Sequence, residues 1–272
     1  METGMRPARE PKWMAVITLV MTAACSHEHH KHAPADAIPE RISIGAGTVT
    51  EGTVRSTLRR SRTLGAYSIT KTPVTVSQFR QCVSDGACRT PSLKAGTCAT
   101  LSGIDGATYN AGVATAPITC VTVSEARAYC EWVGGRLPRP SEWLMAARGP
   151  EVHPFAWGEN PPTNDRIARA SFFASPASDC GDACVDRVGS RPRGESPSGL
   201  ADVLVTRTEL TDAEEESLIG ACRPPATGCA ILALSPGAID QWLPAAESGA
   251  SAEVAANAPA ASFRCVWEGE SR

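Results

Sequence analysis

Alternation of apolar and polar residues marks both ends of the patterned part of the chain. The stretch RISIGAG, which starts at Arg41, alternates and then stops at glycines, as is typical of a strand followed by a turn. A second short strand is indicated at Tyr67–Ile69. Near the other end, Phe263, Cys265 and Trp267 share one face of ASFRCVWEG, so we predict a final strand there.

Between these strands, helical spacing with start and stop signals predicts short helices. Thr75 and Gln78 are spaced as a capping box, and Gly86 can end that helix in the left-handed conformation. PITCVTV is expected to be a strand that leads into a second helix, capped by Ser124 and ended by Gly134. The apolar stripe of this second helix comprises Ala126, Tyr129, Cys130 and Val133.

Two more helices are predicted further along the chain. Pro140 suits the first turn of a helix that Gly149 ends, and Arg139 stands at its cap position. The missing side-chain cap should cost about 1 kcal/mol. TELTDAEEESLIGA is predicted to be a short acidic helix with the capping box Thr211–Glu214.

Composition and charge narrow the class of protein. The chain has 272 residues, of which 42% are hydrophobic, enough for one large domain or two small ones. The formal net charge of -3 gives no reason to expect nucleic acid as a partner. The 23 glycines and 21 prolines indicate many turns.

Residues 1–24 are predicted to be a signal peptide. Basic residues precede WMAVITLVMTAAC, an apolar run too short to span a bilayer of roughly 30 Å. TAAC followed by Ser26 resembles a bacterial lipobox, in which Cys25 would carry the lipid. This predicts a protein anchored to a bacterial membrane, facing the periplasm or the exterior. An ordinary secretory signal with an incidental cysteine is the alternative.

Residues 25–40 are polar and rich in Pro and Ala, and we predict a tether. It holds four of the five histidines: His27, His29, His30 and His32. Clustered histidines can bind zinc, copper or nickel, and the alternative is a solvated linker, since nothing fixes their geometry.

Cysteine usage agrees with export. The chain has 11 cysteines, and without a lipidated Cys25 an even set remains. An even set of this density in an exported chain predicts a disulfide framework.

Several blocks, in one order, resemble the formylglycine-generating enzyme (sulfatase-modifying factor) family. These blocks are ITKTPVTVSQFRQCV, PITCVTVSEARAYCEWVGGRLPRPSEWLMAARG, FAWGENPP, VGSRPRGESPSGLAD and SFRC. The resemblance covers residues 41–268. It implies an irregular α+β fold of the C-type-lectin type, with few regular elements and with the first and last strands near each other.

The resemblance also exposes what the chain lacks. Active members use Cu(I) and oxygen to oxidise a protein cysteine, through a C-x4-C pair that follows an R-G-G-S segment. Neither pattern occurs in this chain. Cys222 and Cys229 are the nearest candidates, and their alternative is a disulfide within one loop. Two thiolates are what a linear Cu(I) site requires.

A calcium site is equally incomplete. The family's Ca²⁺-associated G-N-V-W-E-W segment aligns with VTRTEL, in which Glu209 is retained and Thr206 replaces the asparagine. One carboxylate is too few for a hard cation. Asp202 also matches the family, with a turn or cap residue as its alternative role. His153 fits no family motif and is expected to be a surface or loop histidine.

One disulfide follows from the resemblance, because Cys130 and Cys265 match family positions that are joined. Such a long closed loop is worth roughly 4 to 5 kcal/mol in the chain-entropy treatment.

Three functions remain open. The first is a lipid-anchored binding or scaffold module that has lost the oxidase site, a pseudoenzyme with an unknown protein or small-molecule ligand. The second is a copper-dependent oxidase with a rearranged site at Cys222 and Cys229. The third is a metal-scavenging lipoprotein that acts through the tether histidines.

Overall fold

The computed structural model describes residues 1, 33–34, 37–52, 59–92, 98–99, 108–110, 113–153, 155–156, 187–189, 195–203, 208–212, 228–232, 241–244, 258–259 and 261–269. The chain divides into a unit of residues 1–30 and a unit of residues 31–272, and the fold below is that of the second. The expectations for the signal peptide, for Cys25 and for the tether histidines fall outside the described residues.

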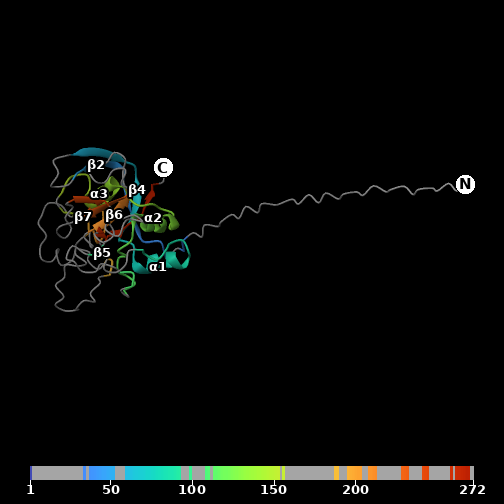
Figure 1. Ribbon diagram of the computed structural model, residues 1–272. Coiled ribbons are helices and arrows are strands. Elements are labelled where there is room, and N and C mark those ends of the chain that lie inside the picture. The colour runs from blue at the N-terminus through green and yellow to red at the C-terminus, as the bar shows by residue number, and fades with distance from the viewer. Residues whose placement is uncertain are drawn as a thin grey trace, which may run out of the picture. The chain divides into compact units, whose positions relative to one another are not determined.

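A three-stranded antiparallel sheet joins the two ends of the domain (Figure 1). Its strands are β1 (Arg41–Ile44), β4 (Tyr67–Thr70) and β11 (Val266–Glu268), in the order β1-β4-β11. Ile69 of β4 is the partner of Ile42 on one side and of Val266 on the other. Both strands predicted near the start of the domain are confirmed, and the first and last strands lie in one sheet.

A hairpin of β2 (Gly47–Glu51) and β3 (Arg60–Leu64) follows β1. Val49 and Leu64 are buried on its inner face, while Thr48 and Thr63 are exposed. Helix α3 (Pro140–Arg148) packs against both strands.

A second sheet has the order β10-β6-β7-β8. Its strands are β10 (Ser262–Phe263), β6 (Thr208–Asp212), β7 (Gly228–Leu232) and β8 (Gln241–Pro244). The predicted acidic helix is wrong over its first residues, since Thr208–Asp212 is a strand paired on both edges. Tertiary pairing there overrides the local capping pattern. A short parallel pair, β5 (Cys98–Ala99) with β9 (Ala258–Pro259), completes the strands that the structure describes.

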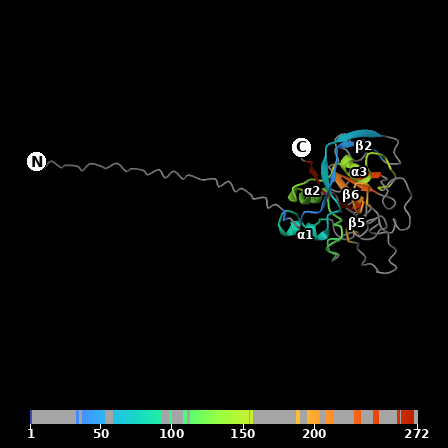
Figure 2. The ribbon, with the colours of Figure 1, turned by 180° about the vertical axis from the view of Figure 1, so that it is seen from behind.

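Helices α1 (Val76–Ser84) and α2 (Val123–Trp132) confirm most of their predicted signals (Figure 2). Thr75 caps α1 in a capping box with Gln78. The cap of α2, however, is Thr122 and not Ser124, because Thr122 forms a capping box with Glu125. A Thr with Glu three residues later satisfies two backbone N–H groups, which Ser124 could not do at its position.

The strand predicted before α2 is absent from the described residues 117–122. Pro117 makes only an isolated bridge to Thr75, and Cys120 has a φ of 60°, which no extended strand accommodates. Helix α3 starts as predicted, with Pro140 in its first turn and no side-chain cap from Arg139. The Arg139 amide instead donates to the Glu142 carboxylate at 2.7 Å.

The final strand is broken in two. Phe263 lies in β10, which pairs with β6, whereas Trp267 lies in β11, which pairs with β4. Arg264 and Cys265 form the break, and both are fully buried. The chain passes from one sheet to the other at this point, so the predicted single final strand is in fact two short strands.

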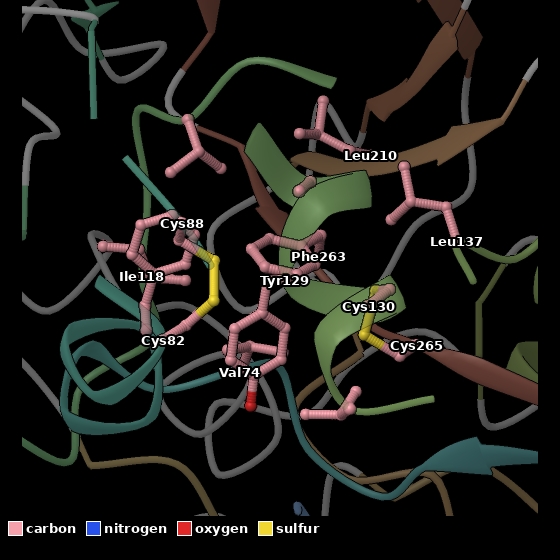
Figure 3. Packing of buried hydrophobic residues seen from close by; sticks show 14 of the residues in the cluster. Val74, Cys82, Cys88, Ile118, Tyr129, Cys130, Leu137, Leu210, Phe263 and Cys265 are labelled. Atoms are coloured by element: carbon pink, nitrogen blue, oxygen red, sulfur yellow. A yellow bond between two sulfur atoms is a disulfide. The ribbon is translucent and has the colours of Figure 1, made fainter. Parts of the chain in front are cut away.

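Two clusters of buried residues form the interior. The α1–α2 core is built around α1 and α2 and reaches Leu210 and Phe263 (Figure 3). The β4–α3 core is built around β1, β4, the β2–β3 hairpin and α3, and it includes Ile69, Trp143 and Val266. The segment from Phe263 to Val266 therefore contributes to both cores.

Candidate functional site

Arg264 forms the most densely bonded junction among the described residues. Its side chain is fully buried at the break between β10 and β11. Its Nε donates to Glu209 Oε2 at 2.9 Å and its Nη2 donates to Glu209 Oε1 at 3.1 Å. Trp143 Nε1 also donates to Glu209 Oε2, at 2.8 Å. The carboxylate is thus held by a two-point guanidinium contact and by an indole, which is strong and directional pairing.

The remaining donors of Arg264 hold backbone carbonyls. Nη1 donates to the carbonyl of Lys71 at 2.7 Å, just after β4. Nη2 donates to the carbonyls of Ala201 at 2.7 Å and Asp202 at 3.1 Å. One side chain therefore ties together the end of β4, β6 and the turn at 201–202, and it is linked to α3 through Glu209. A buried ion pair is tolerated only when its hydrogen bonds are this complete.

Asp202 lies in an unusual backbone conformation beside this junction. Its φ is 54°, and its side chain is buried. Its Oδ2 accepts a hydrogen bond from the amide of Gly189. The carboxylate thereby joins two loops, which matches the turn-residue role considered from the sequence.

Glu209 has its carboxylate oxygens bound by Arg264 and Trp143, in a fully buried position. A divalent cation there would lie against the Arg264 guanidinium, and like charges in a buried site repel strongly. Both carboxylate oxygens of Glu209 are thus already bound within the fold. Thr206 lies outside the described residues, among which no group of three or more His, Cys, Asp or Glu could hold a metal ion.

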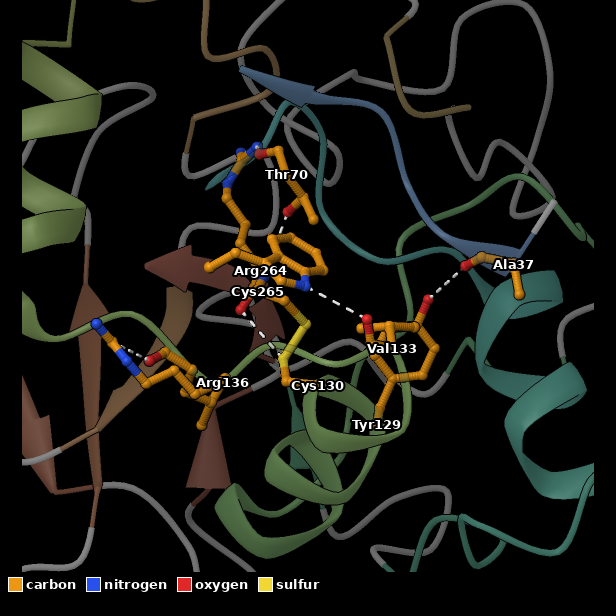
Figure 4. The surroundings of a disulfide bond; sticks show 10 residues. Ala37, Thr70, Tyr129, Cys130, Val133, Arg136, Arg264 and Cys265 are labelled. Carbon is orange, nitrogen blue, oxygen red and sulfur yellow. Dashed lines mark hydrogen bonds between the residues drawn. A yellow bond between two sulfur atoms is a disulfide. The ribbon is translucent and has the colours of Figure 1, made fainter. Parts of the chain in front are cut away.

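The cysteine side chains that the structure describes are all in disulfides. Cys130 is bonded to Cys265, the bridge that the family resemblance implied (Figure 4), and Cys82 is bonded to Cys88. Cys120 is disulfide-bonded as well. These bridges account for the sulfur of the α1–α2 core.

The side chains of the two candidate copper ligands lie outside the described part of the structure. Cys222 lies outside the described residues, and of Cys229 only the backbone is described, in β7 opposite Thr211. The structure therefore does not test whether these two sulfurs meet.

A second set of charged residues joins the helices to the sheets, and the sequence did not reveal it. Arg136 donates to both oxygens of Glu142, at 2.6 and 2.7 Å, and also to Glu268. The hydrogen bond from Arg136 lowers the pKa of Glu268, and Glu142 raises the pKa of Arg136. Burial raises the pKa of Asp212, although Arg127 lies 2.6 Å from its carboxylate and opposes this shift.

Arg148, at the end of α3, covers the free edge of β2. Its Nη2 donates to the carbonyl of Thr50 at 2.7 Å and its Nη1 to that of Gly52 at 3.0 Å. The amide of Thr50 donates to the carbonyl of Pro150. Burial, with Arg59 nearby, lowers the pKa of Arg148 to about 10. His153 follows in the loop after α3 and is half-buried.

Only some of these buried polar residues carry a recognisable signal in the sequence. Arg264 belongs to the SFRC block that carries the resemblance, but no local pattern singles it out within that block. Trp143 and Arg148 lie in a regular helical stretch in which nothing local distinguishes them. No helix in the described part of the chain is long and apolar enough to cross a bilayer.

By sequence, this chain resembles a described protein family and two known proteins. A family profile described as "Sulfatase-modifying factor enzyme 1-like domain" matches residues 26–215. A formylglycine-generating enzyme of Mycobacterium tuberculosis is 32% identical over 101 residues. An inactive C-alpha-formylglycine-generating enzyme 2 of Bos taurus is 31% identical over 105 residues. These alignments cover 36% and 37% of this chain and 33% and 34% of the relatives, about a third of their length.

Solved structures share the fold. PvdO from Pseudomonas aeruginosa has a TM-score of 0.55 at 16% identity, over 86% of this chain and 95% of that one. CarF has a TM-score of 0.54 at 15% identity, over 86% and 100%. Variable protein 1 of Treponema denticola has a TM-score of 0.55 at 15% identity, over 84% and 95%. At such identities the likeness shows the fold alone, and it confirms the irregular α+β architecture.

Proposed function

Because this chain belongs to the sulfatase-modifying factor family, we propose that it is a family domain without the oxidase site, which acts by binding. In this proposal Cys25 carries a lipid and holds the domain at the bacterial cell envelope, outside the cytoplasm. The ligand would be a protein or a small molecule.

The observation that carries the proposal is the missing copper-binding pattern in the sequence. The cysteine side chains that the structure describes are all in disulfides, and those of Cys222 and Cys229 are not among them. A Cu(I) site requires two free thiolates, and a disulfide supplies none. The R-G-G-S segment and the C-x4-C spacing are also missing from the sequence. The bovine relative, which is named inactive, supports a domain of this type without the activity.

The geometry of Glu209 supports the same conclusion. The one retained residue of the calcium-associated segment is neutralised by Arg264 within the fold. In this fold it joins β6 to Arg264, between β10 and β11, and to Trp143 of α3, which a binding scaffold needs as much as an enzyme does.

Free-thiol counting tests the proposal directly. Native, lipid-processed protein should incorporate no iodoacetamide, and mass-spectrometric mapping should place Cys222 and Cys229 in disulfides. As a control, the same protein after unfolding and reduction should label at its cysteines. Free thiols at both positions in the native protein would contradict the loss of the site.

A copper-dependent oxidase is the second candidate, favoured by the M. tuberculosis relative named a formylglycine-generating enzyme. It requires tight Cu(I) binding by the reduced protein and oxygen consumption with a cysteine-containing peptide. Both should disappear in Cys222→Ser and persist in Ser84→Ala, a surface control. Absence of Cu(I) binding would eliminate this candidate.

A further inference from the structure

The segment before β1 is part of the folded domain. Ala37 is fully buried, and its carbonyl accepts a hydrogen bond from the Tyr129 hydroxyl at 3.1 Å (Figure 4). The Ala37 amide donates to the carbonyl of Pro34 at 2.9 Å. The carbonyl of Glu40 accepts from the amide of Lys71 at 2.8 Å. The sequence had placed all of these residues except Lys71 and Tyr129 in the tether.

This segment packs against the α1–α2 core. Ala37 is a member of that core, and Ala33 and Ile38 pack against it while partly buried. Tyr129, which binds Ala37, stacks on Phe79 of α1 at a ring-centroid distance of 5.9 Å. The chain is therefore attached at the α1–α2 side of the domain from residue 33 onward.

The attachment shortens the link to a lipidated Cys25. Eight residue-to-residue steps separate Cys25 from Ala33, and at about 3.6 Å each they span at most about 29 Å. If the link had run freely to Arg41, the limit would have been about 58 Å.

The shorter span limits how the domain can be oriented relative to the bilayer. A compact domain of about 240 residues has a radius of gyration of about 18 Å, and hence a diameter of about 45 Å. A link of about 29 Å cannot pass around a body of that size. The far side of the domain therefore cannot reach the bilayer that holds the lipid.

On these grounds we propose that the α1–α2 side, with residues 33–40 docked on it, is the surface that faces the lipid bilayer. Strand β2 of the hairpin then lies farther from the bilayer than α1, since Figures 1 and 2 show β2 at the top of the domain and α1 low in it. This inference rests on the lipid anchor of the proposed function.

The bilayer contact is peripheral. Apart from Met1, no large hydrophobic side chain is exposed among the described residues, so the described part of the α1–α2 side has none to insert into the acyl chains. The lipid supplies the affinity, and the docked segment supplies the orientation.

The docking is tested without any lipid, in full-length protein carrying Cys25→Ser. Deleting residues 33–40 should lower the melting temperature, whereas deleting residues 26–32 should leave it unchanged. In the undeleted protein, hydrogen exchange should protect the Ala37 amide. Equal melting temperatures for the two deletions, or an unprotected Ala37 amide, would overturn the docking.

The orientation is tested with the lipidated protein in phosphatidylglycerol–phosphatidylethanolamine vesicles that contain an energy-transfer acceptor. A donor is attached through an azide-bearing residue at Ser84 of α1 or at Thr63 of β3, both exposed. Transfer should be higher from Ser84. Inserting eight Gly/Ser residues between His32 and Ala33 should reduce this difference, and the same insertion after Gly269 should not.

The outcomes separate the two proposals. Equal transfer from both donors would overturn the membrane-facing side while leaving the anchor intact. No transfer from either donor, together with no incorporation of labelled palmitate at Cys25, would overturn the anchor and with it the orientation. The deletion pair would still decide whether residues 33–40 belong to the fold.

Discussion

The two cores of this domain are held together by different means. The α1–α2 core is apolar and aromatic: Phe79, Tyr129 and Phe263 lie with ring centroids 5.6–6.3 Å apart. Two disulfides pass through it. The β4–α3 core instead has charged groups buried at its margins, including Arg148, Glu142 and Glu51.

The two cores therefore differ in whether their stability comes from neighbouring or from distant parts of the sequence. The α1–α2 core forms from amphipathic helices whose stripes bury themselves and are then cross-linked covalently. The β4–α3 core depends on guanidinium groups that bind carbonyls and carboxylates from remote elements, such as Arg148 on β2. Arg264 lies where the two cores meet and serves both. Removing the long disulfide, the buried ion pair and a helix cap in turn should therefore lower the free energy of unfolding by successively smaller amounts.

The largest loss is expected from opening the long disulfide. Replacing Cys130 and Cys265 with alanine should lower the free energy of unfolding by about 5 kcal/mol, because the bridge closes a loop with a sequence separation of 135. The same change at Cys82 and Cys88, separated by 6, should cost only about 2 kcal/mol. Urea unfolding of both double variants measures the ratio, and equal costs would refute the loop-length explanation.

Arg264→Met should come next. It leaves the Glu209 carboxylate buried without its partner and several carbonyls unpaired, at a cost of roughly 3–5 kcal/mol. Adding Glu209→Gln should recover part of the loss. Arg89→Met, at an exposed position, is the matched control and should stay within about 0.5 kcal/mol of the parent in urea unfolding. A loss in Arg264→Met no larger than in this control would show that the Arg264 junction does not stabilise the fold.

Each core contains a buried tyrosine that should make the fold less stable at alkaline pH. Burial raises the pKa of Tyr67 in the β4–α3 core and of Tyr129 in the α1–α2 core. Above about pH 10 the unfolded chain releases protons that the folded protein retains, so stability is lost as the pH rises.

Each tyrosine should contribute about 1.4 kcal/mol per pH unit to this slope. Tyr67→Phe and Tyr129→Phe should each make the decline above pH 10 shallower by that amount, measured by urea unfolding at successive pH values. Slopes unchanged from the parent would show that the hydroxyls ionise in the folded state.

The smallest effect distinguishes two neighbouring hydroxyl residues. Thr122→Ala should destabilise by about 1 kcal/mol, because Thr122 caps α2 together with Glu125. Ser124→Ala should change stability by only a few tenths, since Ser124 lies inside the helix. The reverse order in thermal unfolding would restore the cap assignment made from sequence.

Sequence reasoning succeeded where a signal and its effect lie within one or two turns of chain. The capping box at Thr75 and Gln78 is confirmed, and Gly86 and Gly134 adopt positive φ values of 77° and 78°. The predicted stripe of α2 is buried throughout. The family blocks also conveyed the fold and one long-range bridge, Cys130–Cys265, which no local pattern could show.

Other predictions from the sequence were wrong because the structure at those positions depends on tertiary contacts. Residues 208–212 read locally as the start of a helix, yet they form a strand because β10 and β7 pair with both edges. Ala37 read as tether because a lone alanine carries no sign of the Tyr129 hydroxyl that binds its carbonyl. No local pattern marked Arg264 as buried, whereas in the fold it is fully buried and pairs with Glu209.

The sequence by itself determined helices α1, α2 and α3, most of their ends, the family and the absence of the R-G-G-S segment, because each depends on contiguous residues. Only the tertiary structure decided that Glu209 neutralises Arg264 and that the domain begins before Arg41. The reason is physical: a buried charge is tolerated only beside its partner, and the partner is 55 residues away along the chain. Such a pairing exists only once the chain has folded.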